Sequence, residues 1–317
     1  MITIETVQSA RETISDTLTS TPLIMDHVLS ERLGRRVWLK GELFQRTGSF
    51  KPRGGINWIR SANWDELAGG LGAVSAGNHA LGLAWAAREA DVPVTIVMPD
   101  NASPFKVDGS RALGAEVILH GDINDAWTLM HELIDQRGLT LVHPYDDLRI
   151  IAGQGTVGLE ILEQAPETSA ILCPIGGGGL ISGIGIATSA LQPELKLFGV
   201  EPAGAASMAY AWALGGPKHL DRIDTCAKSL AAAVVGEHTY HLCRQVTDDL
   251  IAVNDEAIQR AIHHLIQHTK LYAEPGAAVG VASLLEGMVE LPPTGDIVVV
   301  ITGGNMDRQE LDRLRPV

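Results

Sequence analysis

Residues 170–190 read AILCPIGGGGLISGIGIATSA, and the fold class can be inferred from them. A strand-like apolar run ending at Cys173-Pro174-Ile175 leads into a glycine loop and then a helical pattern. In such a loop, backbone amides can surround an anion at the helix N-terminus, where the helix dipole also favours negative charge. We therefore predict a phosphate site in a parallel α/β unit, with a plain glycine turn as the alternative. The loop consists of Gly176, Gly177, Gly178 and Gly179.

The alternation of strand and helix extends along the chain on both sides of this loop. Strand-like runs precede helical patterns at 72–74 and 78–90, at 94–97 and 106–113, and at 117–119 and 126–137. After the loop come a strand over 196–200, a helix over 255–268 and a strongly apolar strand over 297–301. This rhythm predicts an α/β fold built on parallel sheets.

Composition limits the class of protein. The chain has 317 residues, 45% of them hydrophobic, which is enough for two domains, and its net charge of −14 opposes binding to nucleic acid. No segment has the length and apolarity of a membrane span, and the first twenty residues do not resemble a signal peptide. Three cysteines without CxxC spacing indicate neither disulfides nor a zinc site. We expect a cytoplasmic protein without nucleic-acid or membrane partners.

A second cluster is Ser49-Phe50-Lys51-Pro52-Arg53-Gly54. A lysine beside an aromatic residue can form an imine when its ammonium is partly desolvated and its pKa falls, although a lone lysine is more often a surface charge. An imine-forming lysine together with a phosphate loop indicates pyridoxal phosphate. A dinucleotide is the alternative, because Glu201 lies near the spacing of a ribose-binding acid, but the glycines give no GxGxxG frame.

Two more clusters follow strand-like runs. Amides of Ser75-Ala76-Gly77-Asn78-His79 could hold a carboxylate and the Asn78 side chain could bond a ring hydroxyl. The simpler alternatives are a helix N-cap at Ser75 or Asn78 and a His79 side chain satisfied by a neighbour. In Thr302-Gly303-Gly304-Asn305, the Thr302 hydroxyl could face a ring nitrogen at the carboxyl end of the sheet, or the segment could be a glycine turn.

In this order and at these separations, the four clusters resemble the fold-type II pyridoxal-phosphate enzymes, and among them the branch of threonine dehydratases and serine racemases. The resemblance implies a tryptophan synthase β-like fold of two doubly wound parallel-sheet domains. Residues 1–57 and 145–317 would form the large cofactor domain, with a small domain, residues 58–144, inserted. It also implies a homodimer, and we expect no C-terminal regulatory domain. Further motifs that carry it are Thr21-Pro22-Leu23, Lys40-Gly41-Glu42-Leu43, Ile151-Ala152-Gly153-Gln154-Gly155-Thr156, Val200-Glu201-Pro202 and Glu274-Pro275-Gly276.

The resemblance also implies roles for site residues. Lys51 would carry the cofactor as a Schiff base and remove the substrate α-proton, and Phe50 would pack on the cofactor ring. Asn78 would bond the phenolic oxygen, Thr302 would face the pyridine nitrogen and the four loop glycines would hold the phosphate. The substrate carboxylate would lie on the loop from Ser75 to His79. The implied reaction is α,β-elimination of water from threonine or serine, which yields a 2-oxo acid and ammonia.

The chain departs from the family pattern at several positions. Ala76 replaces the serine that serves racemases as a second acid or base, so dehydration is expected over racemisation. The Mg²⁺ or Ca²⁺ site of relatives would correspond to Glu201 and Ala205, with Ser207 in place of an acidic ligand, so metal binding should be weak.

Two further departures lie beside the predicted site. Lys228-Ser229 replaces an Asp-Gly pair near the substrate pocket, which leaves 3-hydroxyaspartate, phenylserine or a similar amino acid as alternative substrates. Pro52 directly follows the reactive lysine, a position that suits the first turn of a helix. An amino-acid racemase and, more remotely, a nucleotide-binding oxidoreductase are the alternative functions.

Overall fold

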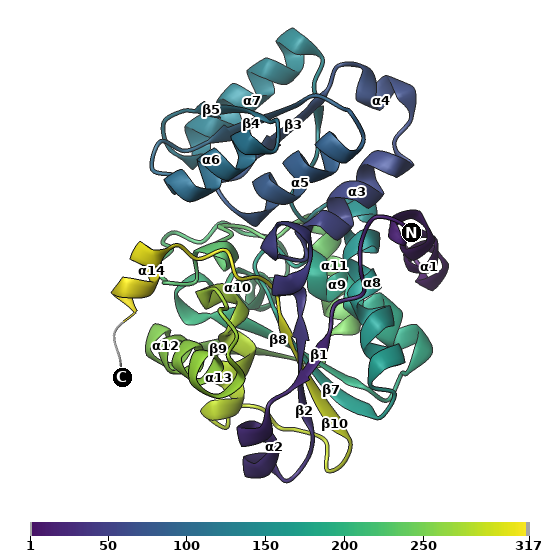
Figure 1. Cartoon of the computed structure of the whole chain (residues 1–317), viewed down its shortest axis with the longest axis vertical. Helices are drawn as coiled ribbons and strands as arrows, with labels where there is room; N and C mark the ends of the chain where they lie inside the picture. Colours follow the sequence, from purple (N-terminus) through teal and green to yellow (C-terminus); the bar gives the residue numbers. More distant parts are fainter. Residues whose placement is uncertain (1, 315–317) are drawn as a thin grey trace.

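The computed structural model describes residues 2–314, within which the chain forms two β-sheets (Figure 1). The six-stranded sheet has the order β1-β2-β10-β7-β8-β9 and the four-stranded sheet the order β5-β4-β3-β6. The strands are β1 (Leu23–Met25), β2 (Val37–Gly41), β3 (Leu71–Val74), β4 (Val94–Met98), β5 (Glu116–Leu119), β6 (Thr140–Leu141), β7 (Thr168–Pro174), β8 (Lys196–Pro202), β9 (Asp249–Val253) and β10 (Asp296–Ile301).

Helices cover both sheets. The four-stranded sheet and helices α4 to α7 form one end of the molecule, and the six-stranded sheet forms the other (Figure 1). The helices are α1 (Ile4–Ile14), α2 (His27–Leu33), α3 (Lys51–Ser61), α4 (Trp64–Ala68), α5 (Asn78–Glu89), α6 (Pro104–Ala112), α7 (Ile123–Arg137), α8 (Leu148–Gln164), α9 (Gly179–Leu191), α10 (Ser207–Leu214), α11 (Glu237–Val246), α12 (Asp255–His264), α13 (Val279–Leu285) and α14 (Arg308–Arg313).

The predicted α/β class with parallel sheets is confirmed. The strand pairs are parallel except for β1 with β2, which is antiparallel at the sheet edge. Only eleven residues, 26–36, separate these two strands, fewer than a parallel crossover needs. The helix expected over 255–268 ends at His264 and continues as a π-helical turn, Leu265–Thr269.

The division into two domains at residues 58 and 144 stays a prediction. Strands β3 to β6 all lie between these positions, but residue 58 falls within α3. Residues 1 and 315–317, at the ends of the expected large domain, lie outside the described part of the chain. Among residues 2–314, no helix combines the length and apolarity that crossing a membrane requires.

Helix α8 lies between α3 and α9 and approaches both closely. A Cβ atom on Gly153 would lie 2.5 Å from the carbonyl oxygen of Arg53 in α3. On the other face, a Cβ atom on Gly183 of α9 would lie 2.4 Å from the carbonyl oxygen of Ile151. Glycines are therefore needed where these helices cross, which explains the sequence Ile151 to Thr156.

A buried ion network connects α3, α8 and β2. The Arg53 guanidinium donates to both oxygens of Glu42 at 2.8 and 2.9 Å and to both oxygens of Glu160 at 2.7 and 3.0 Å. Lys40 donates to Glu160 at 2.6 Å and to the Thr21 carbonyl at 2.7 Å. The charges of the two cations and the two carboxylates balance. The motifs around Thr21 and Lys40 therefore have a structural role in the buried interior.

We predict that Arg53→Met lowers the free energy of unfolding by about 3–5 kcal/mol, because Glu42 would remain buried without a cation and Glu160 would keep only Lys40. Urea denaturation followed by circular dichroism measures the change. The control is Arg11→Met, which removes the exposed ion pair with Glu163 and should cost less than about 1 kcal/mol. Equal costs for the two variants would contradict the structural role of the network.

Candidate active site

Lys51 is the first residue of α3, and Pro52 occupies the first turn as expected. The Lys51 ammonium donates to the Pro144 carbonyl at 2.7 Å and lies 5.2 Å from the centroid of the Phe50 ring. A Cβ atom on Gly82 of α5 would lie 2.8 Å from the Lys51 Cβ, so this stem is closely packed. Burial lowers the pKa of Lys51 to about 8, against the opposing charge of Glu274. With this pKa, roughly a tenth of the amine is neutral at pH 7.

The glycine loop joins β7 to α9 as predicted. Gly178 is the N-cap of α9 and has a φ of +92°, a conformation that favours glycine. A Cβ atom on Gly177 would lie 2.2 Å from the ring of Tyr145, so this position also needs glycine. In the described part of the chain, the amides of Gly176, Gly177 and Gly178 donate to no backbone carbonyl. These amides and the N-terminus of α9 are suited to an anion.

Residues 302–305, which follow β10, lie directly beside residues 49–51. Ser49 and Gly303 form an antiparallel bridge, and the Phe50 amide donates to the Thr302 carbonyl at 3.2 Å. Thr302 is buried, as is Ser49, whose hydroxyl has no hydrogen-bond partner among residues 2–314. Two of the four sequence clusters thus meet at the carboxyl end of the large sheet.

Asn78 connects a third cluster to these two. Its side-chain oxygen accepts from the Asn305 amide at 2.8 Å, and its own amide donates to Glu274 at 2.7 Å. A carboxamide nitrogen carries two hydrogens, so one N–H of Asn78 stays available to a ligand. The N-cap of α5 is Gly77, so the expectation of a cap at Ser75 or Asn78 was wrong. The reason is that the Asn78 side chain turns away from the helix to Glu274 and Asn305.

In the rest of the loop from Ser75 to His79, the backbone rather than the side chains is available to bind a ligand. His79 is buried, and one of its ring nitrogens lies 3.0 Å from the Val142 carbonyl. Burial, with help from the Lys51 charge, lowers the pKa of His79 to about 3. His79 is therefore neutral and satisfied by a neighbour, as the simpler alternative anticipated. Ser75, Ala76 and Gly77 are half-buried at the N-terminus of α5.

Glu201 does not fit a metal site. Its two carboxylate oxygens accept from the amides of Met208 and Ala209 at 2.8 and 2.9 Å, at the start of α10. Burial raises the pKa of Glu201 to about 7, which weakens it as an anionic ligand. Ala205 offers only backbone, and no cluster of three histidines, cysteines or acidic residues that could hold a metal occurs within the described residues. The Glu201 carboxylate instead caps the N-terminus of α10.

Sequence reasoning missed several residues that contact Lys51 or the glycine loop. Pro144 accepts the lysine hydrogen bond, and Tyr145 lies against Gly177 and donates its hydroxyl to the Val234 carbonyl at 2.8 Å. His143 accepts the Asp146 amide at 2.8 Å. These residues belong to His143-Pro144-Tyr145-Asp146-Asp147, a polar and aromatic run that directly precedes α8 and was the available signal.

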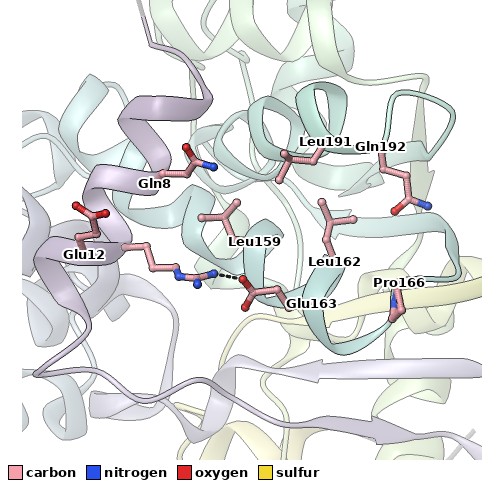
Figure 2. A pocket seen from close by; sticks show the side chains of 9 residues that line it. Gln8, Glu12, Leu159, Leu162, Glu163, Pro166, Leu191 and Gln192 are labelled. Carbon is pink, nitrogen blue, oxygen red and sulfur yellow. Dashed lines mark hydrogen bonds and ion pairs between the residues drawn. The ribbon is translucent and has the colours of Figure 1, made fainter.

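A surface hollow of about 520 Å³ lies elsewhere (Figure 2). It lies at the C-terminal end of α8, between Leu159, Glu163 and Gln192, and Arg11 forms an ion pair with Glu163 across it. Since α8 rises by about 1.5 Å per residue, this hollow is roughly 20 Å from the Pro144 end of the helix. It is therefore separate from the Lys51 site.

Comparisons with known proteins agree with this geometry. Residues 14–303 match the family described as "Pyridoxal-phosphate dependent enzyme". The chain belongs to this family. It is 40% identical over 316 residues to the L-threonine ammonia-lyase of Thermotoga maritima, covering 99% of this chain and 78% of that protein. It is 34% identical to the L-threo-3-hydroxyaspartate ammonia-lyase of Saccharomyces cerevisiae over 95% of this chain and 92% of the relative.

A solved structure of the same family has the same fold. Maize serine racemase superimposes with a TM-score of 0.94 at 32% identity, over 98% of this chain and 96% of that one. The chain is a fold-type II pyridoxal-phosphate enzyme of the threonine dehydratase and serine racemase branch, as the sequence motifs predicted. The dinucleotide alternative is set aside. Lys51, the glycine loop amides, the remaining N–H of Asn78 and Thr302 offer the groups that the cofactor needs.

We predict that Gly177→Ala weakens pyridoxal phosphate binding roughly tenfold or more, because its Cβ would overlap the Tyr145 ring and shift the loop. Titration of the cofactor into cofactor-free protein, followed by absorbance, measures the dissociation constant. Gly216→Ala is the control, since a Cβ there meets nothing within 4 Å. Equal affinity in the two variants would show that the loop does not hold the cofactor.

Proposed function

We propose that this protein is a pyridoxal-phosphate-dependent ammonia-lyase that dehydrates L-threonine and L-serine to a 2-oxo acid and ammonia. The observation that carries the proposal is the desolvated Lys51, which bonds to Pro144 next to the Tyr145 ring that packs on the glycine loop, and whose neighbour Phe50 bonds to Thr302. Pyridoxal phosphate, when bound at Lys51, supplies an electron sink for the bond that breaks at the substrate Cα. The relatives named for threonine support the choice of substrate.

The proposed roles of the residues follow from their positions. The neutral Lys51 amine removes the Cα proton, since its lowered pKa leaves it available as a general base. Amides at the N-terminus of α5, in the loop Ser75 to His79, bind the substrate carboxylate. Phe50 would pack on the cofactor ring, and the amides of the four loop glycines would hold its phosphate. Loss of the β-hydroxyl as water gives an enamine, which hydrolyses to the 2-oxo acid and ammonia.

Two residues favour elimination over other reactions at this site. Thr302 would offer the cofactor's ring nitrogen a hydroxyl rather than a carboxylate, which would leave that nitrogen unprotonated and disfavour transamination. Ala76 has no group that can exchange a proton on the face opposite Lys51. The proposed assembly is a homodimer in the cytoplasm, and its partner is a small amino-acid substrate.

We predict that purified protein releases 2-oxobutanoate from L-threonine and pyruvate from L-serine, each with one equivalent of ammonia. Lys51→Ala should lose on the order of 10²–10⁴ in turnover, the usual contribution of a general base, and the colour of the lysine-bound cofactor. Lys218→Ala is the control, because Lys218 is an exposed lysine outside the site. L-threo-3-hydroxyaspartate belongs in the panel. Faster oxaloacetate formation from it would reassign the substrate, and wild-type turnover by Lys51→Ala would remove Lys51 from the mechanism.

Racemisation is the second candidate, since the maize relative is named a serine racemase. We predict that the wild-type protein forms little D-serine relative to pyruvate and that Ala76→Ser raises this ratio, because a hydroxyl would then stand opposite Lys51. Chiral chromatography of the products from L-serine measures both. D-serine in excess of pyruvate from the wild-type protein would contradict the proposed lyase.

A further inference from the structure

The His143 side chain holds the turn that leads from β6 into α8. Its Nδ1 atom accepts the Asp146 amide at 2.8 Å and the Tyr145 amide at 3.4 Å. Both donors are backbone N–H groups, so Nδ1 must carry its lone pair, and the proton of the neutral ring lies on Nε2. His143 thus satisfies amides two and three residues farther along the chain, as an asparagine does in an Asx turn.

The surroundings of His143 favour its neutral form. The ring is half-buried, and burial lowers the pKa of His143. The charges of Asp146 and Asp147 act to raise this pKa and the charge of Lys51 acts to lower it, and the pKa stays below its usual value. His79, a further titratable neighbour, is itself neutral. The Nδ1 lone pair is therefore present at neutral pH.

Aromatic contacts define the plane of the His143 ring. The ring stacks on Trp127 of α7, with centroids 6.0 Å apart and planes at 28°. The Tyr145 ring meets it edge-on, with centroids 4.6 Å apart and planes at 87°. Trp127 in turn packs on the hydrophobic core of the small sheet. His143 therefore connects the small sheet to the turn before α8.

This turn brings two groups to the Lys51 site. The Pro144 carbonyl accepts from the Lys51 ammonium at 2.7 Å. Tyr145 forms a wall of the glycine loop, since its ring would lie 2.2 Å from a Cβ atom on Gly177 and its carbonyl oxygen 2.9 Å from one on Gly179. The shape of the loop thus depends on where the turn holds Tyr145.

We propose that His143 is a positioning residue: by accepting the Tyr145 and Asp146 amides, it holds Tyr145 against the glycine loop and sets that loop for the cofactor phosphate. This inference rests on the proposed function in one respect, since it requires pyridoxal phosphate at Lys51. Without the acceptor, the two amides lose their partner, and the Tyr145 ring is no longer fixed on the loop. The groups offered to the cofactor ring are unchanged, so the effect should fall on the phosphate.

The variant His143→Phe removes the Nδ1 acceptor and keeps an aromatic ring in its place. It should remain folded, since the Asp146 carboxylate still accepts the Thr239 amide at 3.0 Å. Its dissociation constant for pyridoxal phosphate should rise roughly tenfold, whereas that for pyridoxal, which lacks the phosphate, should stay within about twofold of wild type. Titration of each compound after removal of the cofactor from the loaded enzyme, followed by absorbance, measures both constants.

Two further variants separate the hydrogen bonds from the ring. His143→Asn lacks the ring but keeps an acceptor at the δ1 position, so its preference for the phosphorylated cofactor should be within about threefold of wild type. The matched control is His131→Phe, because His131 is exposed on α7 and contacts the same Trp127 ring at a centroid distance of 6.0 Å. Both dissociation constants should be unchanged in this control.

The ratio of the two dissociation constants decides the outcome. An unchanged ratio in His143→Phe would overturn the inference, whether both affinities are retained or both fall together. A ratio that His143→Asn does not restore would overturn it as well. In each case a coloured, active wild-type enzyme would leave the proposed function intact, whereas a wild-type protein that binds no cofactor would overturn both.

Discussion

The arrangement of the site depends on the buried ion network around Arg53. Arg53 lies two residues after Lys51, and its guanidinium is held by two carboxylates: Glu42, directly after β2, and Glu160 of α8. Burial acts to raise the pKa of Glu160, but Arg53 and Lys40 outweigh it, and the pKa is lowered. The carboxylate is therefore charged at neutral pH, and its bonds fix the first turn of α3. The position of the Lys51 backbone follows from this constraint.

Around this fixed lysine, segments far apart in the sequence are brought together by sheet topology. The central strands β7 and β10 are parallel neighbours. The glycine loop and the Thr302 segment therefore both begin at the carboxyl ends of the strands, on the same side of the large sheet. The loop before α5 comes from the small sheet and reaches them through Asn78. Each segment supplies a different type of group: an amine, backbone amides, a carboxamide and a hydroxyl. Together these groups match the polar atoms of one cofactor.

The sequence predicted the parts of the fold that depend on local pattern. Strand followed by glycines and an apolar helix is a local signal, and the structure has β7 and α9 within a few residues of the prediction. Helix α8 was not predicted as an element, although the sequence motif that contains its glycines was noted. These glycines allow close contact with α3 and α9, which a local pattern does not reveal. The alternative of a helix cap at Asn78 failed for a related reason, since the Asn78 side chain bonds to residues some 200 positions away. Tyr145 likewise acquires its role only through tertiary contacts.

The proposed reaction requires that Lys51 carries the cofactor. Borohydride reduction of the coloured protein, followed by peptide mass mapping, tests it most directly, because reduction fixes the cofactor to the lysine that holds it. We expect loss of visible colour and a single modified peptide that contains Lys51. Modification of another lysine, such as Lys106 or Lys228, or a protein without reducible colour, would contradict it.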